Sequence, residues 1–215
     1  NYKTLVLDSS WIKARNIMGY SDNFKRKELM KIFLGQSFID VRKSFISFVP
    51  ESVPLLIQNK LVNYYVSKLK SDPSLHDKIE FEIAINCLIF DFEKRINELC
   101  PNLLNKKEVK ILKEKYLMIF KKTQENNNNG SINLNLNKIK KLNENYEYYK
   151  KEKNIKKIIR FTINYGIIPF SILARHAFVA ENLLRSLVRL KIIDNKDLEN
   201  FKSDLETVTS KFIFH

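Results

Sequence analysis

The sequence predicts a mainly α fold, a multi-helix domain with at most a small β element near residues 36–42. The chain has only four glycines and five prolines in 215 residues, too few for the many tight turns of a sandwich or barrel. Apolar residues recur at helical spacing over most of its length. With 44% hydrophobic and 12% aromatic residues, the chain can bury a sizeable core.

In the first half of the chain, we expect one or two helices over residues 1–35. Residues 36–42 (Gln-Ser-Phe-Ile-Asp-Val-Arg) alternate apolar and polar side chains and predict a short strand. Pro54 opens a predicted helix that continues through Lys70. The most apolar long segment, residues 75–99, has helical periodicity and predicts one long helix.

In the second half, residues 106–122 predict a basic amphipathic helix. An asparagine-rich stretch then predicts a flexible loop over residues 123–137. A lysine-rich helix should follow over about residues 138–164 and stop near Gly166. Residues 168–191 and 195–211 should form a closing pair of helices. No fixed-period repeat is visible, so we treat residues 1–215 as one domain.

The net charge of +14 is concentrated in the middle of the chain. Residues 101–160 hold sixteen Lys/Arg and six Asp/Glu, and Arg160 is the one arginine among them. This pattern favours a solvated lysine surface over a polyanion site, because arginine recognises phosphate better than lysine does. Nucleic acid is therefore an unfavoured partner, although a polyanion site stays open as an alternative.

The remaining composition favours a cytoplasmic protein without membrane contact. Cys87 and Cys100 fit no metal-ligand spacing. No signal segment opens the chain, and no apolar run approaches the length of a membrane span. We also expect no metal site in this domain.

Residues 168–190 carry the most suggestive polar pattern. On a helical wheel, Arg175 and Arg185 share one arc with several further polar residues. The others on this arc are Ser171, Glu181, Asn182, Ser186 and Arg189. Three arginines on one face could clamp a phosphate or carboxylate, or the arc could be a solvent-facing stripe. His176 falls on the opposite, apolar arc, which favours a packed core residue over a catalytic one.

Two further places could carry chemistry. Asp40 and Arg42 lie on the same face of the predicted strand, where they form either a structural ion pair or a ligand contact. Glu80 and Asp91 share one narrow face of the predicted helix 75–99 and could hold a substrate amine over a cavity. The sequence lacks the glycine-rich motifs that cradle nucleotide phosphates, so ATP should not bind here.

Three stretches, in order along the chain, resemble one family. The first is Trp11–Tyr20 with Gly35 and residues 40–50, similar to a pattern ending Asp-Val-Arg-x-Ser-Phe-Asn-Ser-Phe-x-Pro. The second is Leu-Val-Asn-Tyr-Tyr at residues 61–65, followed by His-Asp-Lys-Ile-Glu-Phe-Glu-Ile at residues 76–83. The third is Tyr165-Gly166-x-x-Pro169-Phe170-x-x-Leu173-Ala174-Arg175, continued by residues 183–188. The sequence departs from the pattern at Ile46 and His176.

These stretches are similar to phosphoenolpyruvate-synthase-like phosphotransferases of surface-polysaccharide gene clusters, a family that includes kinases of L-glutamine. The resemblance implies three parts: an ATP-grasp domain, a middle domain for the phosphate acceptor, and a domain bearing a phosphohistidine. The middle part alone is present here, so ATP and Mg would serve the full-length enzyme. ATP would phosphorylate a histidine elsewhere, releasing AMP and phosphate, and the phosphohistidine would transfer to an acceptor such as L-glutamine. We expect the acceptor to contact Asp40, Arg42, Glu80, Arg175 and Arg185. The rival readings are a helical RNA- or polyanion-binding module and a protein-interaction scaffold.

Overall fold

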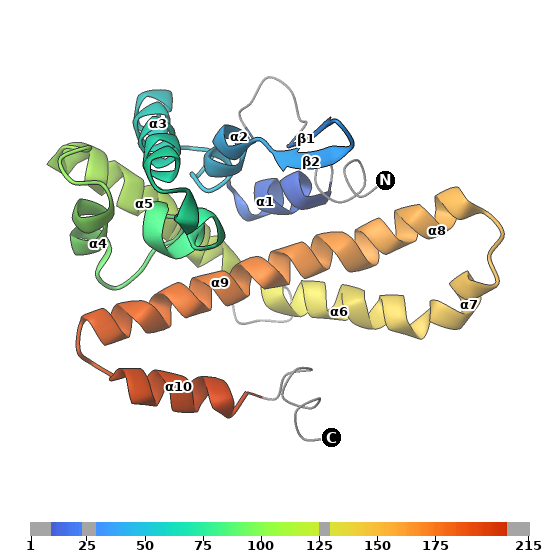
Figure 1. The fold of residues 1–215 in the computed structure, drawn as a ribbon. Coiled ribbons are helices and arrows are strands. Elements are labelled where there is room, and N and C mark those ends of the chain that lie inside the picture. Colours follow the sequence, from blue (N-terminus) through green and yellow to red (C-terminus); the bar gives the residue numbers. More distant parts are fainter. Residues whose placement is uncertain (1–9, 23–28, 125–129, 206–215) are drawn as a thin grey trace.

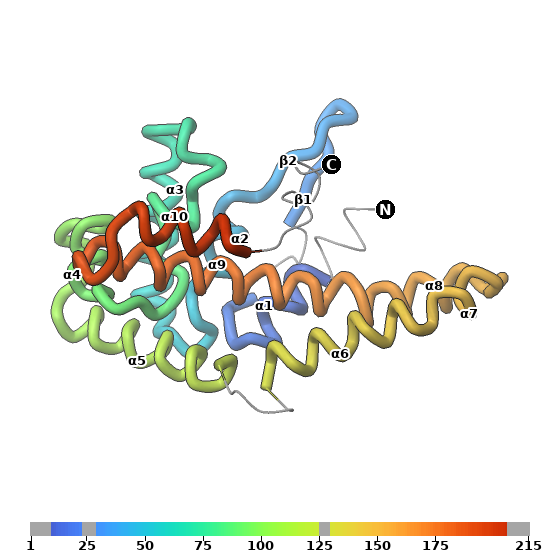
Figure 2. Tube along the Cα trace, turned by 90° about the horizontal axis from the view of Figure 1, so that it is seen from below, coloured from blue at the N-terminus to red at the C-terminus, as the bar shows by residue number. Residues whose placement is uncertain are grey.

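The structure, a computed structural model, describes residues 10–22, 29–124 and 130–205. Helices dominate these residues, and the sheet they contain is a two-stranded antiparallel hairpin (Figure 1). The prediction of a mainly α fold with a small β element is therefore confirmed. An N-terminal lobe, residues 10–123, packs against a long helix, and an extended helical arm, residues 131–167, leads away from this lobe (Figure 2).

The N-terminal lobe begins with a short helix and the β-hairpin. The hairpin pairs Met30 with Ile39 and turns through Leu34 and Gly35, both at positive φ. The strand predicted at residues 36–42 is confirmed for its first four residues, whereas the helices expected over residues 1–35 are wrong where the first strand lies. The elements are α1 (Ile12–Met18), β1 (Met30–Phe33), β2 (Gln36–Ile39), α2 (Val41–Ile46) and α3 (Leu55–Ser71).

The segment after α3 is the main departure from the predicted elements. In place of one helix over residues 75–99, the chain forms a 3-10 turn, a π-helical turn, and a non-helical stretch at residues 84–91. These elements are Pro73–Asp77, Ile79–Ile83 and, after the non-helical stretch, α4 (Phe92–Leu99). Side chains from other elements satisfy the buried backbone of the non-helical stretch. The Ile85 N–H donates to Tyr65 Oη at 3.2 Å, and Tyr116 Oη lies 2.9 Å from the Ile85 carbonyl oxygen.

The helix α5 (Lys106–Thr123) closes the lobe and confirms the predicted amphipathic helix. Asn105 and Glu108 form a capping box at its first turn, with both hydrogen bonds at 3.0 Å. The buried face of α5, including Leu112 and Tyr116, joins the apolar core built from α1, α2, α3 and α4. This core fixes the position of the non-helical stretch.

The arm and the long helix make up the rest of the fold. Helix α6 packs along α9, and α7 and α8 form the far end of the arm (Figure 1). Residues 131–137 are helical, so that part of the predicted loop 123–137 is wrong, and residues 125–129 lie outside the described residues. The helix expected over 138–164 is interrupted at residues 151–154. The elements are α6 (Ser131–Glu144), α7 (Tyr146–Lys150), α8 (Ile155–Thr162), a π-helical turn (Ile163–Ile167), α9 (Ile168–Arg189) and α10 (Asn195–Ser203).

Gly166 does not end a helix, contrary to the prediction. The chain stays helical from Ile155 to Arg189, and Gly166 lies in its π-helical turn. A Cβ at this position would lie 3.1 Å from Leu142 Cδ2 of α6. The glycine therefore permits the close approach of α6 to the long helix, while tertiary packing maintains helical structure through it.

This continuous helix is long and apolar enough to cross a membrane by length and composition, with a mean hydropathy of 1.3 in its most apolar window. No stretch of this kind was expected from the sequence. Part of the helix is buried against α1 and α6. Core helices meet the same criteria, so the finding carries no membrane assignment.

Candidate anion-binding centre

The polar arc of α9 faces the N-terminal lobe. Arg175 is 1% exposed, and Asn182 and Ser186 are also buried. Arg189 donates two hydrogen bonds to the carboxylate of Asp91, at 2.6 and 2.9 Å. The alternative of a solvent-facing stripe is therefore wrong for Arg175, Asn182 and Ser186, which lie between α9 and the lobe. The Glu181–Arg185 pair that such a stripe would carry is present at 2.7 Å, and the Arg185 side chain is 41% exposed.

Arg175 is held by the non-helical stretch and by Tyr20. Its Nη2 donates to Asn86 Oδ1 at 2.8 Å and to the backbone carbonyl of Asn86, and both Nε and Nη2 lie 3.3 Å from Tyr20 Oη. Tyr20 Oη in turn donates to the same Asn86 carbonyl at 3.0 Å. Burial acts to lower the pKa of Arg175, but Tyr20 and Cys87 outweigh it, so this pKa lies above its ordinary value. Arg175 stays a cation.

Arg15, on α1, is a second buried arginine beside the first. It is 7% exposed and stacks its guanidinium over the rings of Trp11 at 4.5 Å and Phe48 at 4.9 Å. Burial, with the neighbouring charge of Arg175, lowers the pKa of Arg15 to about 9. At neutral pH both side chains therefore carry positive charge in the same buried region.

The two guanidiniums share their surroundings. Both lie over the rings of Tyr20 and Phe48, at centroid distances between 4.9 and 5.8 Å. Each has a buried Nη1 atom without a hydrogen-bond partner. Within the described residues, no carboxylate forms an ion pair with either arginine. An unpaired buried cation is costly, and two of them together create a site of strong positive potential. An anion that accepted hydrogen bonds from both Nη1 atoms would satisfy both groups.

Glu80 contributes negative charge to the surroundings of Arg15. Its charge acts to raise the pKa of Arg15, but among the described residues no ion pair within 4.0 Å joins the two. The backbone carbonyl of Glu80 accepts a hydrogen bond from Asn86 Nδ2 at 2.7 Å, which ties the π-helical turn to the partner of Arg175. Glu80, Asn86 and Asn182 line one small pocket. Arg175 and Glu80 are thus the two predicted site residues that the structure brings together.

The other predicted site residues lie elsewhere. Asp40 caps α2 by accepting from Lys43 N at 3.1 Å, and it also lies 3.6 Å from Lys43 Nζ. Arg42 is exposed and donates to Asn63 Oδ1 of α3 at 2.6 Å. Asp40 and Arg42 do not pair with each other, and Arg42 shares no partner with Arg175. The expectation that Arg42 and Arg175 both contact one acceptor is therefore not supported by the geometry.

Arg185 has a local role on the far part of α9. It pairs with Glu181 at 2.7 Å and lies over the ring of Phe81 at 4.3 Å. Glu181 also pairs with Lys202 of α10 at 2.7 Å. These contacts join α9, α10 and the π-helical turn, and they leave Arg185 outside the arginine pair.

Arg15 was missed by the sequence reasoning, because α1 also carries the exposed residues Lys13 and Asn16, and its sequence does not mark Arg15 as the buried polar residue. His176 was expected to be a packed residue, and it is buried between α6 and the end of α5. Its ring nitrogens lie 3.0 Å from Ser131 Oγ and 3.2 Å from Gln124 Nε2. Burial, with the charge of Arg175, lowers the pKa of His176, so it is neutral at physiological pH.

No family model matches the chain, and neither the curated proteins nor the solved structures contain a match to it. Across residues 10–22, 29–124 and 130–205, no group of three or more His, Cys, Asp or Glu side chains is placed to hold a metal ion.

Proposed function

We propose that the chain is the acceptor-binding domain of an ATP-dependent, dikinase-type phosphotransferase, and that Arg15 and Arg175 bind the anionic group of the acceptor. The observation that supports this proposal is the buried arginine pair, with an unpartnered Nη1 on each residue and no carboxylate within ion-pair distance of either guanidinium among the described residues. A fold without a ligand gains nothing from two uncompensated buried cations, because apolar residues of similar volume would be more stable there.

The proposed ligand carries a carboxylate or phosphoryl group and a separate positive group. Guanidinium Nη1 atoms of both arginines would donate to the anionic oxygens. The carboxylate of Glu80 would receive an amino group, since it has no ion-pair partner among the described residues. L-glutamine fits this polarity and is the acceptor that the family resemblance suggests. Ligand entry requires local opening, because both arginines are buried.

In the proposed reaction this domain orients the acceptor and does not bind ATP. ATP-grasp and phosphohistidine domains of the same enzyme would form the phosphohistidine with release of AMP and phosphate. The positive charge of Arg15 and Arg175 would then favour the approach of the phosphoryl group to the bound acceptor. Such a domain would serve capsule modification in the cytoplasm.

Calorimetric titration of the 215-residue chain tests the binding step directly. L-Glutamine should bind, whereas L-glutaminamide, in which an amide replaces the α-carboxylate, should not. Inorganic phosphate should compete with L-glutamine for the site. Arg15→Gln and Glu80→Gln should each abolish or strongly weaken binding. Arg42→Gln, which changes an exposed arginine, is the matched control and should bind like the parent chain.

A second measurement tests the enzymatic assignment. The enzyme that contains this domain should release AMP from ATP only when its acceptor is present. Release of ADP instead, or acceptor binding unaffected by Arg15→Gln in a folded protein, would refute the proposal.

A further inference from the structure

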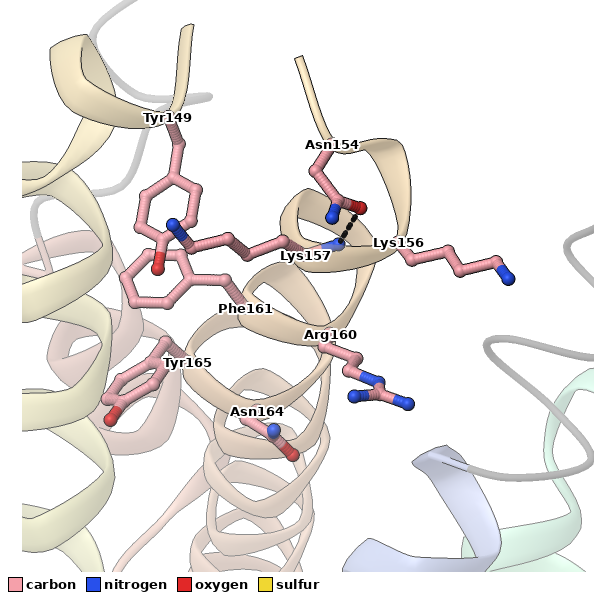
Figure 3. Close-up of a pocket in the computed structure, with 8 residues that line it drawn as sticks. All are labelled: Tyr149, Asn154, Lys156, Lys157, Arg160, Phe161, Asn164 and Tyr165. Atoms are coloured by element: carbon pink, nitrogen blue, oxygen red, sulfur yellow. Dashed lines mark hydrogen bonds between the residues drawn. The ribbon is translucent and has the colours of Figure 1, made fainter. Parts of the chain in front are cut away.

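The far end of the arm carries an open pocket of about 480 Å³ between α7 and α8. Figure 3 shows its two walls: the rings of Tyr149, Phe161 and Tyr165 on one side, and Arg160 and Lys156 on the other. Asn154 and Asn164 are also in the lining. The pocket lies on α7 and α8, at the far end of the arm, whereas the arginine pair lies where α1 packs against α9; these elements are well separated in Figure 1.

The aromatic wall has a structural role within the arm. Tyr149 stacks on Phe161 with a centroid distance of 3.9 Å, and Phe161 contacts Tyr165 at 4.5 Å. These contacts hold α7 against α8. Lys157 is also committed to the arm itself, because it pairs with Glu152 and bonds Tyr148 Oη, which together raise its pKa. The rings and Lys157 therefore make a stiff platform.

The cations beside this platform have no such role. Lys156 and Arg160 are exposed, and within the described part of the chain their side chains have no ion-pair or hydrogen-bond partner. They follow each other at i, i+4 on α8, and Asn164 continues the line. The arm as a whole, residues 131–167, holds nine Lys/Arg and three Glu. Like charges at this spacing disfavour the helix slightly, so the line adds no stability to the arm.

We propose that the tip of the arm binds the phosphate backbone of an RNA. A line of cations and amides along one helix fits the repeating phosphates of a strand, which gain affinity from each cation that neutralises one. The open pocket that these cations line is also lined by the rings of Tyr149, Phe161 and Tyr165, and aromatic rings beside a basic groove stack on unpaired bases. These rings favour a single-stranded nucleic acid over an acidic protein surface. The inference goes beyond the proposed acceptor-binding function and does not depend on it.

Fluorescence anisotropy with a labelled single-stranded RNA of about 16 nucleotides tests the proposal. Affinity should fall steeply between about 50 and about 200 mM salt. The double variant Lys156→Gln/Arg160→Gln should bind more weakly, and its slope of log affinity against log salt should be smaller by about 1.4, because two phosphate contacts are lost. Tyr165→Leu, which removes a ring from the pocket lining, should weaken binding with little change in this slope.

The matched control removes two exposed lysines from the N-terminal lobe. Lys70→Gln/Lys78→Gln lowers the net charge by the same amount and should leave affinity and slope close to those of the parent chain. Equal losses in both double variants would overturn the proposal, because binding would then follow net charge alone. Competition by polyglutamate as effective as that by RNA would also overturn it, in favour of an acidic protein partner. Circular dichroism of each variant confirms that the helices remain folded.

Discussion

Replacement of Arg175 should destabilise the protein strongly, because this side chain supports the non-helical stretch at residues 84–91. In Arg175→Ala, Asn86 Oδ1 loses its donor, and the Asn86 carbonyl keeps only the hydrogen bond from Tyr20 Oη. Hydrogen bonds from charged donors contribute about 1.5–3 kcal/mol each, and the truncation also leaves a cavity. Relief of the repulsion from Arg15 offsets part of this loss. We expect the free energy of unfolding to fall by about 3 kcal/mol.

Thermal unfolding followed by circular dichroism measures this loss. For a chain of this size, about 3 kcal/mol corresponds to a fall in Tm of about 6–12 °C. Arg175→Met restores most of the apolar volume without the charge, so it should lose less than Arg175→Ala. The control Arg42→Ala should stay within about 0.5 kcal/mol of the parent, because Arg42 is exposed.

A double-mutant cycle with Tyr20→Phe separates the network from simple packing. Arg175 and Tyr20 both donate to the Asn86 carbonyl, so their effects should be non-additive by about 1 kcal/mol. An Arg175→Ala protein that unfolds within 2 °C of the parent would refute the structural role. The polar arc of α9 would then be a face that tolerates change, and the packing of α9 would rest on its apolar residues.

Four further predictions follow from the same contacts. Arg15→Gln should stabilise the unliganded protein by about 1 kcal/mol at neutral pH. Burial lowers the pKa of Arg15 to about 9 in the folded protein, so the unfolded chain holds the Arg15 proton more tightly. The stability of the parent should therefore rise relative to that of the variant as pH rises through about 9. Asp91→Ala should cost about 3 kcal/mol, since it leaves Arg189 without its carboxylate, and Asp91→Leu/Arg189→Met should recover much of that loss in urea unfolding. Glu108→Gln should lower the free energy of unfolding by about 1 kcal/mol at about pH 7 and by much less at about pH 3. Hydrogen bonds from Lys60 and from the Asn105 backbone lower the pKa of Glu108, so the stability that its carboxylate contributes is lost as pH falls. The 215-residue chain should not bind ATP at micromolar concentration in calorimetry; tight binding would contradict the assignment of the nucleotide site to another domain.

Local patterns were enough to predict α3, α5 and α9. The apolar stripes of α3 and α5 and the apolar content of α9 are properties of short windows, and helical periodicity reports them directly. The scarcity of glycine and proline predicted the fold class, because a chain with few of these residues cannot form the many tight turns of a sandwich or barrel. The first four residues of the strand near residues 36–42 were also visible, because alternation of apolar and polar residues extends over that window.

The site depended on contacts that no short window contains. Residues 84–91 have the apolar content of a helix, yet Tyr20, Tyr65 and Tyr116 satisfy their backbone groups from distant parts of the chain, which removes the need for helical hydrogen bonds. The wheel placed Arg175 on a polar arc and so suggested solvent or an open cleft. In the folded protein, Asn86 gives that arc a buried partner.

Among the predicted site residues, the sequence by itself determined that Arg175 and Glu80 were unusual polar residues within apolar segments. Only the tertiary structure decided that Arg15 lies beside Arg175, and that Asp40 and Arg42 serve α2 and α3 instead. The physical reason is that periodicity reports which face of an element is apolar, whereas charge compensation depends on which faces meet. Arg15 and Arg175 are separated by most of the chain, and the packing of α1 against α9 brings them to the same aromatic rings.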